Sequence, residues 1–117
     1  MSLFVTAYAS RTTVESIDIL DADGALVTLE ANDVIVIKIG RHENTSLRTI
    51  RSDAAASGGS TTTFTNPTTL TLDEDDLVPS IIKPGVYDME VSVIDASDGN
   101  RVKHAENGIF SLISTIT

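Results

Sequence analysis

The sequence contains no cysteine and no tryptophan, and aromatic residues make up only 4% of its 117 residues. The absence of cysteine excludes disulfide cross-links, thiolate catalysis and cysteine-liganded zinc. With so few aromatic rings, Ile, Val and Leu must fill most of any hydrophobic core. Because Ile and Val are β-branched, this composition favours strands.

Basic residues are also scarce. The chain has 8 Lys and Arg against 17 Asp and Glu, which gives a formal net charge of −9. Such a charge repels the phosphates of nucleic acids and anionic membrane surfaces. We therefore expect no direct nucleic-acid binding and no membrane binding, and we interpret the acidic surface as one that keeps the protein soluble.

Long apolar segments are missing as well. Residues Met1–Tyr8 lack the basic start and the apolar run of a signal peptide, and no segment approaches the roughly 20 apolar residues of a membrane span. We expect the protein to be made and folded in the cytoplasm. A chain of 117 residues has the usual size of one domain, so we predict a single domain over residues 1–117.

Two segments in the C-terminal third carry the clearest pattern. Gly85–Asp95 has an apolar side chain at every second position from Tyr87 onward, with polar side chains between them. Asn107–Thr117 repeats the alternation, with Phe110 and Leu112 on one face. A period of two is that of a half-buried strand. The two segments, joined by a polar arm, therefore predict an antiparallel strand pair over one core.

The other strand patterns are shorter. Residues 3–8 predict an edge strand, or part of an arm over residues 1–10 that orders on a partner. Residues 34–39 form the most apolar run and predict a strand covered on both faces, at least near its start. Further strands are expected at residues 13–20 and 25–29, which form a hairpin around Asp23-Gly24, and at residues 47–51, 61–65 and 68–72.

The segments between the strands contain typical turn and loop residues. Small residues fill positions 52–60 and predict an exposed, flexible, poorly ordered loop. Asn66-Pro67 marks a turn, and residues 73–84 leave room for one short helical turn because two prolines limit its length. About seven or eight short strands with such turn signals predict an all-β fold, an immunoglobulin-like antiparallel β-sandwich.

The apolar faces of these strands define the expected core. Each face takes every second residue of its strand, because successive side chains point to opposite sides of a sheet. The predicted core residues are Ile17, Ile19, Ile35, Ile37, Ile39, Leu72, Tyr87, Met89, Val91, Val93, Phe110 and Leu112.

Asp21-Ala22-Asp23-Gly24 begins like a calcium-binding loop. In an EF-hand the next alternate positions supply oxygen ligands and a bidentate Glu ends the loop, but Ala25, Val27 and Leu29 stand there instead. A hairpin turn explains the segment better. We interpret the acidic run Asp73–Asp76 as a solvated surface and predict no metal ligands.

His42 and His104 are the only histidines, and they are not spaced as a metal-ligand pair. We interpret both as surface residues. No serine has the context of a nucleophile elbow, and no glycine pattern suits a phosphate. The sequence therefore predicts no catalytic residues, no cofactor and no enzyme activity. Asn44-Thr45-Ser46 matches a glycosylation acceptor, which matters only in a secreted protein.

The segment Pro84-Gly85-Val86-Tyr87 resembles the tyrosine corner and the F strand that follows it in immunoglobulin-like domains. This resemblance implies that the Tyr87 hydroxyl ties down the preceding connection. Simple packing of Tyr87 in the core is the alternative role.

A wider pattern combines Gly85-Val86-Tyr87, the Asp98-Gly99 turn, Gly108-Ile109-Phe110 and the polar turn before the apolar strand at residues 29–37. It is similar to the immunoglobulin-like N-terminal module of phage baseplate upper proteins and related tail-fibre proteins, over residues 18–117. In those proteins a helical or fibrous stalk follows the module, whereas this sequence stops at the final strand. The resemblance thus implies a small free-standing virion adaptor, or a truncated chain, rather than a receptor-binding fibre.

We therefore predict a non-enzymatic structural or assembly subunit of a phage or prophage particle, in its tail, baseplate, neck or head adaptor. It is expected in the virion, assembled in the host cytoplasm, packing against other virion proteins or against copies of itself as a homo-oligomer. Strand-forming ends at Leu3–Tyr8 and Ser111–Thr117 suit extension of a neighbour's sheet. The alternative is a carbohydrate-binding or adhesive β-sandwich module, for which three Phe and two Tyr supply few aromatic rings.

Overall fold

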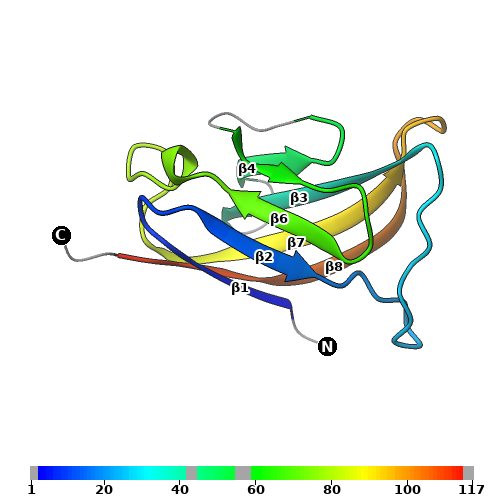
Figure 1. Cartoon of the computed structure of the whole chain (residues 1–117), viewed down its shortest axis with the longest axis horizontal. Helices are drawn as coiled ribbons and strands as arrows, with labels where there is room; N and C mark the ends of the chain where they lie inside the picture. The colour runs from blue at the N-terminus through cyan, green and yellow to red at the C-terminus, as the bar shows by residue number, and fades with distance from the viewer. Residues whose placement is uncertain (1–2, 42–44, 55–58, 115–117) are drawn as a thin grey trace.

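The computed structural model describes residues 3–41, 45–54 and 59–114, which form an immunoglobulin-like β-sandwich (Figure 1). A five-stranded sheet packs against a three-stranded sheet, with one main hydrophobic core between them. In spatial order the larger sheet consists of β1 (Leu3–Tyr8), β8 (Arg101–Ile113), β7 (Gly85–Asp95), β3 (Asp33–Arg41) and β4 (Thr45–Arg51). The smaller sheet consists of β2 (Thr13–Ile17), β6 (Thr68–Leu72) and β5 (Thr61–Thr62).

The predicted pairing of the two C-terminal segments is confirmed. β7 and β8 run antiparallel, with Tyr87 opposite Phe110. The prediction of a polar arm up to residue 106 is wrong, because β8 begins at Arg101 and pairs with the end of β7. The side chains of residues 101–107 are exposed or half-buried throughout, so this half of the strand carries no apolar alternation that marks it in the sequence.

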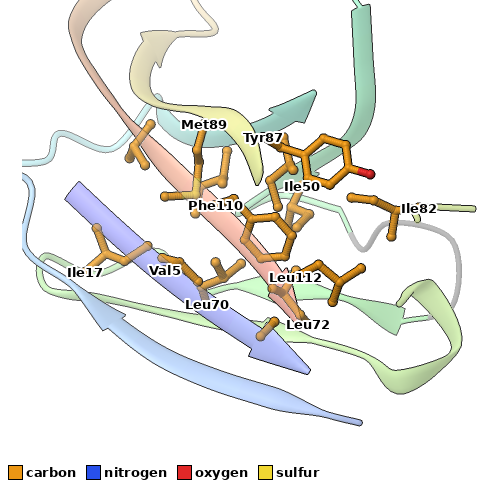
Figure 2. Packing of buried hydrophobic residues seen from close by; sticks show 14 of the residues in the cluster. Val5, Ile17, Ile50, Leu70, Leu72, Ile82, Tyr87, Met89, Phe110 and Leu112 are labelled. Atoms are coloured by element: carbon orange, nitrogen blue, oxygen red, sulfur yellow. The ribbon is translucent and has the colours of Figure 1, made fainter. Parts of the chain in front are cut away.

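All twelve predicted core residues are buried in the main cluster. Figure 2 shows Phe110 in the middle of the labelled side chains, with residues of both sheets around it. The core also contains residues that the strand patterns did not single out; apart from Leu70, which lies in the central strand β6 of the smaller sheet, they lie in edge strands or in connections. These are Val5, Ala7, Ala9, Ile50, Leu70, Leu77 and Ile82.

The apolar run at residues 34–39 forms most of β3, an interior strand of the larger sheet. Val34 and Val36 are buried on the face opposite the main core, where they form a second cluster with Ile94. Lys38 on that same face is exposed. The prediction of a strand covered on both sides near its start is therefore confirmed.

The larger sheet is mixed rather than purely antiparallel, which corrects the prediction. β1 runs parallel to β8, with Phe4 opposite Ile109 and Tyr8 opposite Ile113. Nearly the whole chain separates these two strands, so no hairpin forces them to run in opposite directions. The pairing also shows that residues 3–8 form an edge strand in the folded protein and not an arm.

The predicted strand at residues 25–29 is wrong, although the turn at Asp23-Gly24 is present with Gly24 at φ 83°. This segment forms a single bridge, between Leu20 and Leu26. The amide side chain of Asn66 replaces a strand partner here: it accepts a hydrogen bond from Ile19 N–H at 2.9 Å and donates to the carbonyls of Ile19 and Val27 at 2.8 Å each. β2 pairs instead with β6.

The predicted loop at residues 52–60 is ordered at both ends. Ser52 exchanges hydrogen bonds with Ile35, since its hydroxyl accepts from Ile35 N–H and its N–H donates to the Ile35 carbonyl. Ser60 is fully buried, which corrects the expectation of exposure, because its hydroxyl bonds to Asp76. The other part of the predicted loop, residues 55–58, lies outside the described residues.

The connection between β6 and β7 contains the expected helical turn, the 3₁₀ helix η2 (Glu74–Asp76), whose N-cap is Asp73. The connection ends in a tyrosine corner, because the hydroxyl of Tyr87 donates a hydrogen bond to the carbonyl of Lys83. The Tyr87 ring is also part of the core and contacts Phe110, with 6.4 Å between ring centroids. Tyr87 therefore performs both of the roles weighed for it.

Replacing Asn66 by Ala removes three hydrogen bonds and leaves the N–H of Ile19 and the carbonyl of Val27 without these partners in half-buried surroundings, whereas the carbonyl of Ile19 still accepts from Val27 N–H. Because each such bond contributes about 1 kcal/mol and an unsatisfied group costs more, we expect a loss of about 2–4 kcal/mol in the free energy of unfolding, measured by urea denaturation. The exposed Asn107→Ala variant is the control and should unfold close to the wild type. Equal stability of the two variants would contradict this role of Asn66.

Candidate interaction surface

The outer face of the larger sheet carries an unusual set of exposed apolar side chains. Among the described residues, six large hydrophobic side chains point away from the core there, with exposed fractions of 38–71%. One of them, Val102 on β8, lies opposite Ile94 and apart from the other five. A patch of this kind on a soluble domain marks an interaction site more often than isolated apolar residues do. We call the set of five the outer apolar patch; it consists of Phe4, Tyr8, Val86, Ile109 and Ile113.

Strand register brings these five side chains together. Phe4 lies opposite Ile109 and Tyr8 opposite Ile113 across the β1–β8 pair. Val86 on β7 lies opposite Ser111, the residue midway between the two isoleucines on β8. Neighbours at such positions are within reach of each other across a sheet. The patch therefore extends over three adjacent strands.

Gly108 brings β1 close to β8 at one end of the patch. A Cβ atom at this position would lie 2.4 Å from the carbonyl oxygen of Leu3, so only glycine allows this approach. The neighbouring pair Leu3 and Gly108 is the first of the β1–β8 register. The glycine thus fixes where Phe4 sits against Ile109.

The patch continues into the free edge of β1. Within the described part of the chain, no strand pairs with β1 on the side away from β8. The segment Leu3–Tyr8 contains no charged residue and no proline, whereas natural edge strands are usually protected by such residues. An uncharged edge beside an apolar face offers both backbone and side-chain contacts to another protein.

Charged residues lie at the border of the outer apolar patch and beyond it. Asp88 lies opposite Ile109 at the border of the patch, and Glu90 and Lys38 face each other further along the sheet. In a chain with a net charge of −9, the patch and β1 form a region without formal charge. Contact with another acidic protein is least repulsive there.

Two ionic clusters are structural. Asp76 is almost fully buried; its Oδ1 lies 2.9 Å from Nη2 of Arg48 and its Oδ2 accepts a hydrogen bond from Ser60. The Ser60 hydroxyl in turn accepts from Asp73 N–H at 2.9 Å. These bonds hold η2 against β4. Because both the hydroxyl and the carboxylate are buried, this serine and aspartate are closed to a substrate.

The second cluster joins β3 to β8. Lys103 Nζ lies 3.0 and 3.1 Å from the two carboxylate oxygens of Asp33, and Glu30 is 3.6 Å away. The hydrogen bond to Asp33 raises the pKa of Lys103, and the charges of Asp33 and Glu30 act in the same direction. Lys103 is therefore protonated at neutral pH and neutralises the buried Asp33.

The aspartates that were considered as metal ligands accept hydrogen bonds from backbone N–H groups instead. Asp21 Oδ1 accepts from Asp23 N–H and Ala25 N–H at 2.9 and 3.0 Å, as in a turn. Asp73 caps η2 by accepting from Asp75 N–H. In the described ranges, no three or more His, Cys, Asp or Glu side chains are placed to hold a metal ion.

His104 is half-buried rather than on the open surface, and its Nε2 lies 3.3 Å from Glu106 Oε1. His42 lies outside the described residues.

Among the residues that are described, no helix is long and apolar enough to cross a membrane.

The sequence patterns did not identify the outer apolar patch. The signal was present in adjacent apolar residues such as Val86-Tyr87 and Ile109-Phe110. Since neighbours on a strand point to opposite faces, each such pair places one side chain outside the core.

Comparisons with protein-family models, curated proteins and solved structures find no significant match to this chain.

Replacing Arg48 by Met leaves the buried Asp76 carboxylate without its cationic partner. Breaking a buried ion pair in this way costs about 3 kcal/mol in the free energy of unfolding, which denaturant titration measures directly. Arg101→Met is the matched control, because Arg101 forms an exposed pair with Asp98 and should contribute little. A similar loss of unfolding free energy in the two variants would show that burial does not determine how much the Arg48–Asp76 pair contributes to stability.

Proposed function

We propose that this protein is a non-enzymatic structural subunit of a phage or prophage particle and that it acts by packing against other proteins of the particle. The observation that carries the proposal is the outer apolar patch, which lies beside an unprotected sheet edge. An exposed apolar face of this kind buries surface only when another protein covers it. Assembly rather than turnover is the activity that such a face supports.

The link to phage particles rests on the resemblance of the Gly-x-Tyr and Gly-x-Phe strands to the immunoglobulin-like module of baseplate and tail-fibre proteins. Both motifs lie in strands that form the patch: Val86 stands between Gly85 and Tyr87, and Ile109 between Gly108 and Phe110. The middle residue of each motif points outward while the aromatic residue enters the core. The proposed location is the virion.

A carbohydrate-binding or adhesive module is the alternative. Exposed aromatic rings at Phe4 and Tyr8 favour it, because sugars stack on such rings. These rings lie opposite the aliphatic side chains of Ile109 and Ile113, however, and specific sugar recognition also needs convergent polar groups. Binding of the wild-type protein to defined glycans on an array, lost on Phe4→Ala, would support the alternative and oppose a packing surface.

The genes that flank the coding sequence provide a direct test. Structural genes of phages are clustered, so we expect neighbouring genes for capsid, portal or tail proteins. Neighbours that degrade or bind polysaccharides would favour the alternative function. The comparison requires only the genomic sequence around the gene.

Placing charge in the outer apolar patch should block assembly. We expect Val86→Asp combined with Ile109→Asp to lower the amount of this protein in purified particles by roughly tenfold or more, because burying an unpaired carboxylate is strongly unfavourable. Quantitative mass spectrometry of particles from the strain that carries the gene gives the measurement. Both positions are exposed, and a melting temperature close to that of the wild type would show that the fold is retained.

Val14→Asp is the control, since Val14 is exposed to a similar degree on the opposite sheet. It should enter particles like the wild type. Absence of the wild-type protein from the particles, or normal incorporation of the double variant, would refute the proposed function.

A further inference from the structure

We propose that one partner of this surface is a second copy of the chain, which pairs along the free edge of β1 in antiparallel orientation about a two-fold axis at Thr6. This inference rests on the proposed function, because it names one partner at the free edge beside the outer apolar patch and leaves the joined patches for other proteins of the particle to cover. It follows from three properties of β1: the direction of its free backbone groups, the symmetry of its sequence and its lack of charge.

At one edge of β1 the backbone N–H and C=O groups bond to β8, and at the other edge no strand of the described chain pairs with them. Ala9 N–H donates to the carbonyl of Ile113 in β8. Successive residues of a strand point their N–H and C=O groups to opposite edges. Phe4, Thr6 and Tyr8 therefore direct their backbone groups away from β8, toward the open edge. The carbonyl of Tyr8 accepts a hydrogen bond from Arg11 N–H at 3.2 Å. The groups open to a partner are therefore those of Phe4 and Thr6 and the N–H of Tyr8.

These are also the residues whose side chains are exposed, whereas Val5 and Ala7 point into the core. A strand added at this edge would thus continue the larger sheet and keep the outer apolar patch on the same face. Because the sheet order ends at β1, the added strand meets no other strand of the described chain.

The sequence of β1 is self-complementary about Thr6. Antiparallel pairing centred there places Phe4 opposite Tyr8 of the second copy and Thr6 opposite Thr6 of the second copy. The two Thr6 residues can exchange both backbone hydrogen bonds, and in each Phe4–Tyr8 pair the N–H of Tyr8 can donate to the carbonyl of Phe4. Aromatic residues directly opposite each other stabilise a strand pair, as do paired threonines.

The same pairing places Val5 opposite Ala7 of the second copy on the inner side, a larger residue against a smaller one. The two outer apolar patches then join across the axis into one continuous apolar surface. Isologous contact of this kind is the commonest form of homo-oligomer.

Charge favours a second copy at this edge. Two chains that each carry −9 repel one another over most of their surfaces. Leu3–Tyr8 carries no charge of either sign, so this strand is where two identical acidic chains approach at least cost. This strand also lacks the Lys or Pro that normally prevents edge pairing, which further favours pairing with a second copy.

The absence of cysteine from the chain allows a clean cross-linking test. In the full-length Thr6→Cys protein, two copies of the new thiol would meet at the axis with Cα atoms about 5.5 Å apart, within the disulfide range of about 4.4–6.8 Å. Mild oxidation should therefore give a disulfide-linked dimer on a non-reducing gel. Thr69→Cys, exposed on the smaller sheet, should stay largely monomeric.

The complementary variant is Thr6→Lys, which places two like charges opposite each other at the axis. We expect it to raise the dimer dissociation constant roughly tenfold or more, measured by light scattering over a concentration series. Thr69→Lys should dimerise like the wild type. Thr6 is exposed, and equal melting temperatures of the two lysine variants would show that the fold is intact.

Cross-linking of Thr6→Cys no faster than Thr69→Cys, or equal dimerisation of the two lysine variants, would overturn pairing through β1. If the charged patch variant is still excluded from particles in that case, the proposed function stands and its partner is a different protein. If that variant enters particles normally, the proposed function fails as well.

Discussion

The register of β7 against β8 is the constraint on which the rest of the structure depends. With Tyr87 opposite Phe110, both aromatic rings enter the core and Val86 and Ile109 point outward. A shift by one residue would exchange the two faces and expose the core side chains. The same register therefore builds the interior of the sandwich and the outer apolar patch. It also places β8 so that β1 can pair with its other edge.

Side-chain hydrogen bonds and an ion pair hold the connections between the strands in place. Asn66 bonds to the backbone on either side of the Asp23-Gly24 turn, and Ser60 and Arg48 bind the buried Asp76 of η2. Tyr87 holds the connection that leads into its own strand. Most of these contacts join residues that are far apart in the sequence. They fix loops that have little apolar surface of their own.

The distribution of charge and apolar surface fits an assembly role. Acidic residues dominate the chain as a whole, yet the outer apolar patch and β1 contain none. A protein that only had to remain soluble would gain from polar side chains at Val86 and Ile109, because exposed apolar area lowers solubility. Retaining apolar residues on the outer face is consistent with a surface that another chain covers.

The sequence by itself determined the fold class, the twelve core residues and the tyrosine corner, because alternation along a strand and short turn motifs are local properties. It also contained the adjacent pairs Val86-Tyr87 and Ile109-Phe110, from which outward apolar side chains follow. Only the tertiary structure decided that these side chains meet in one patch, since their proximity depends on the register of three strands. It likewise decided that β1 runs parallel to β8 and leaves one edge free, and that Asn66 replaces a strand at residues 25–29. Pairing between distant segments is set by the packing of the whole domain, which no local pattern specifies.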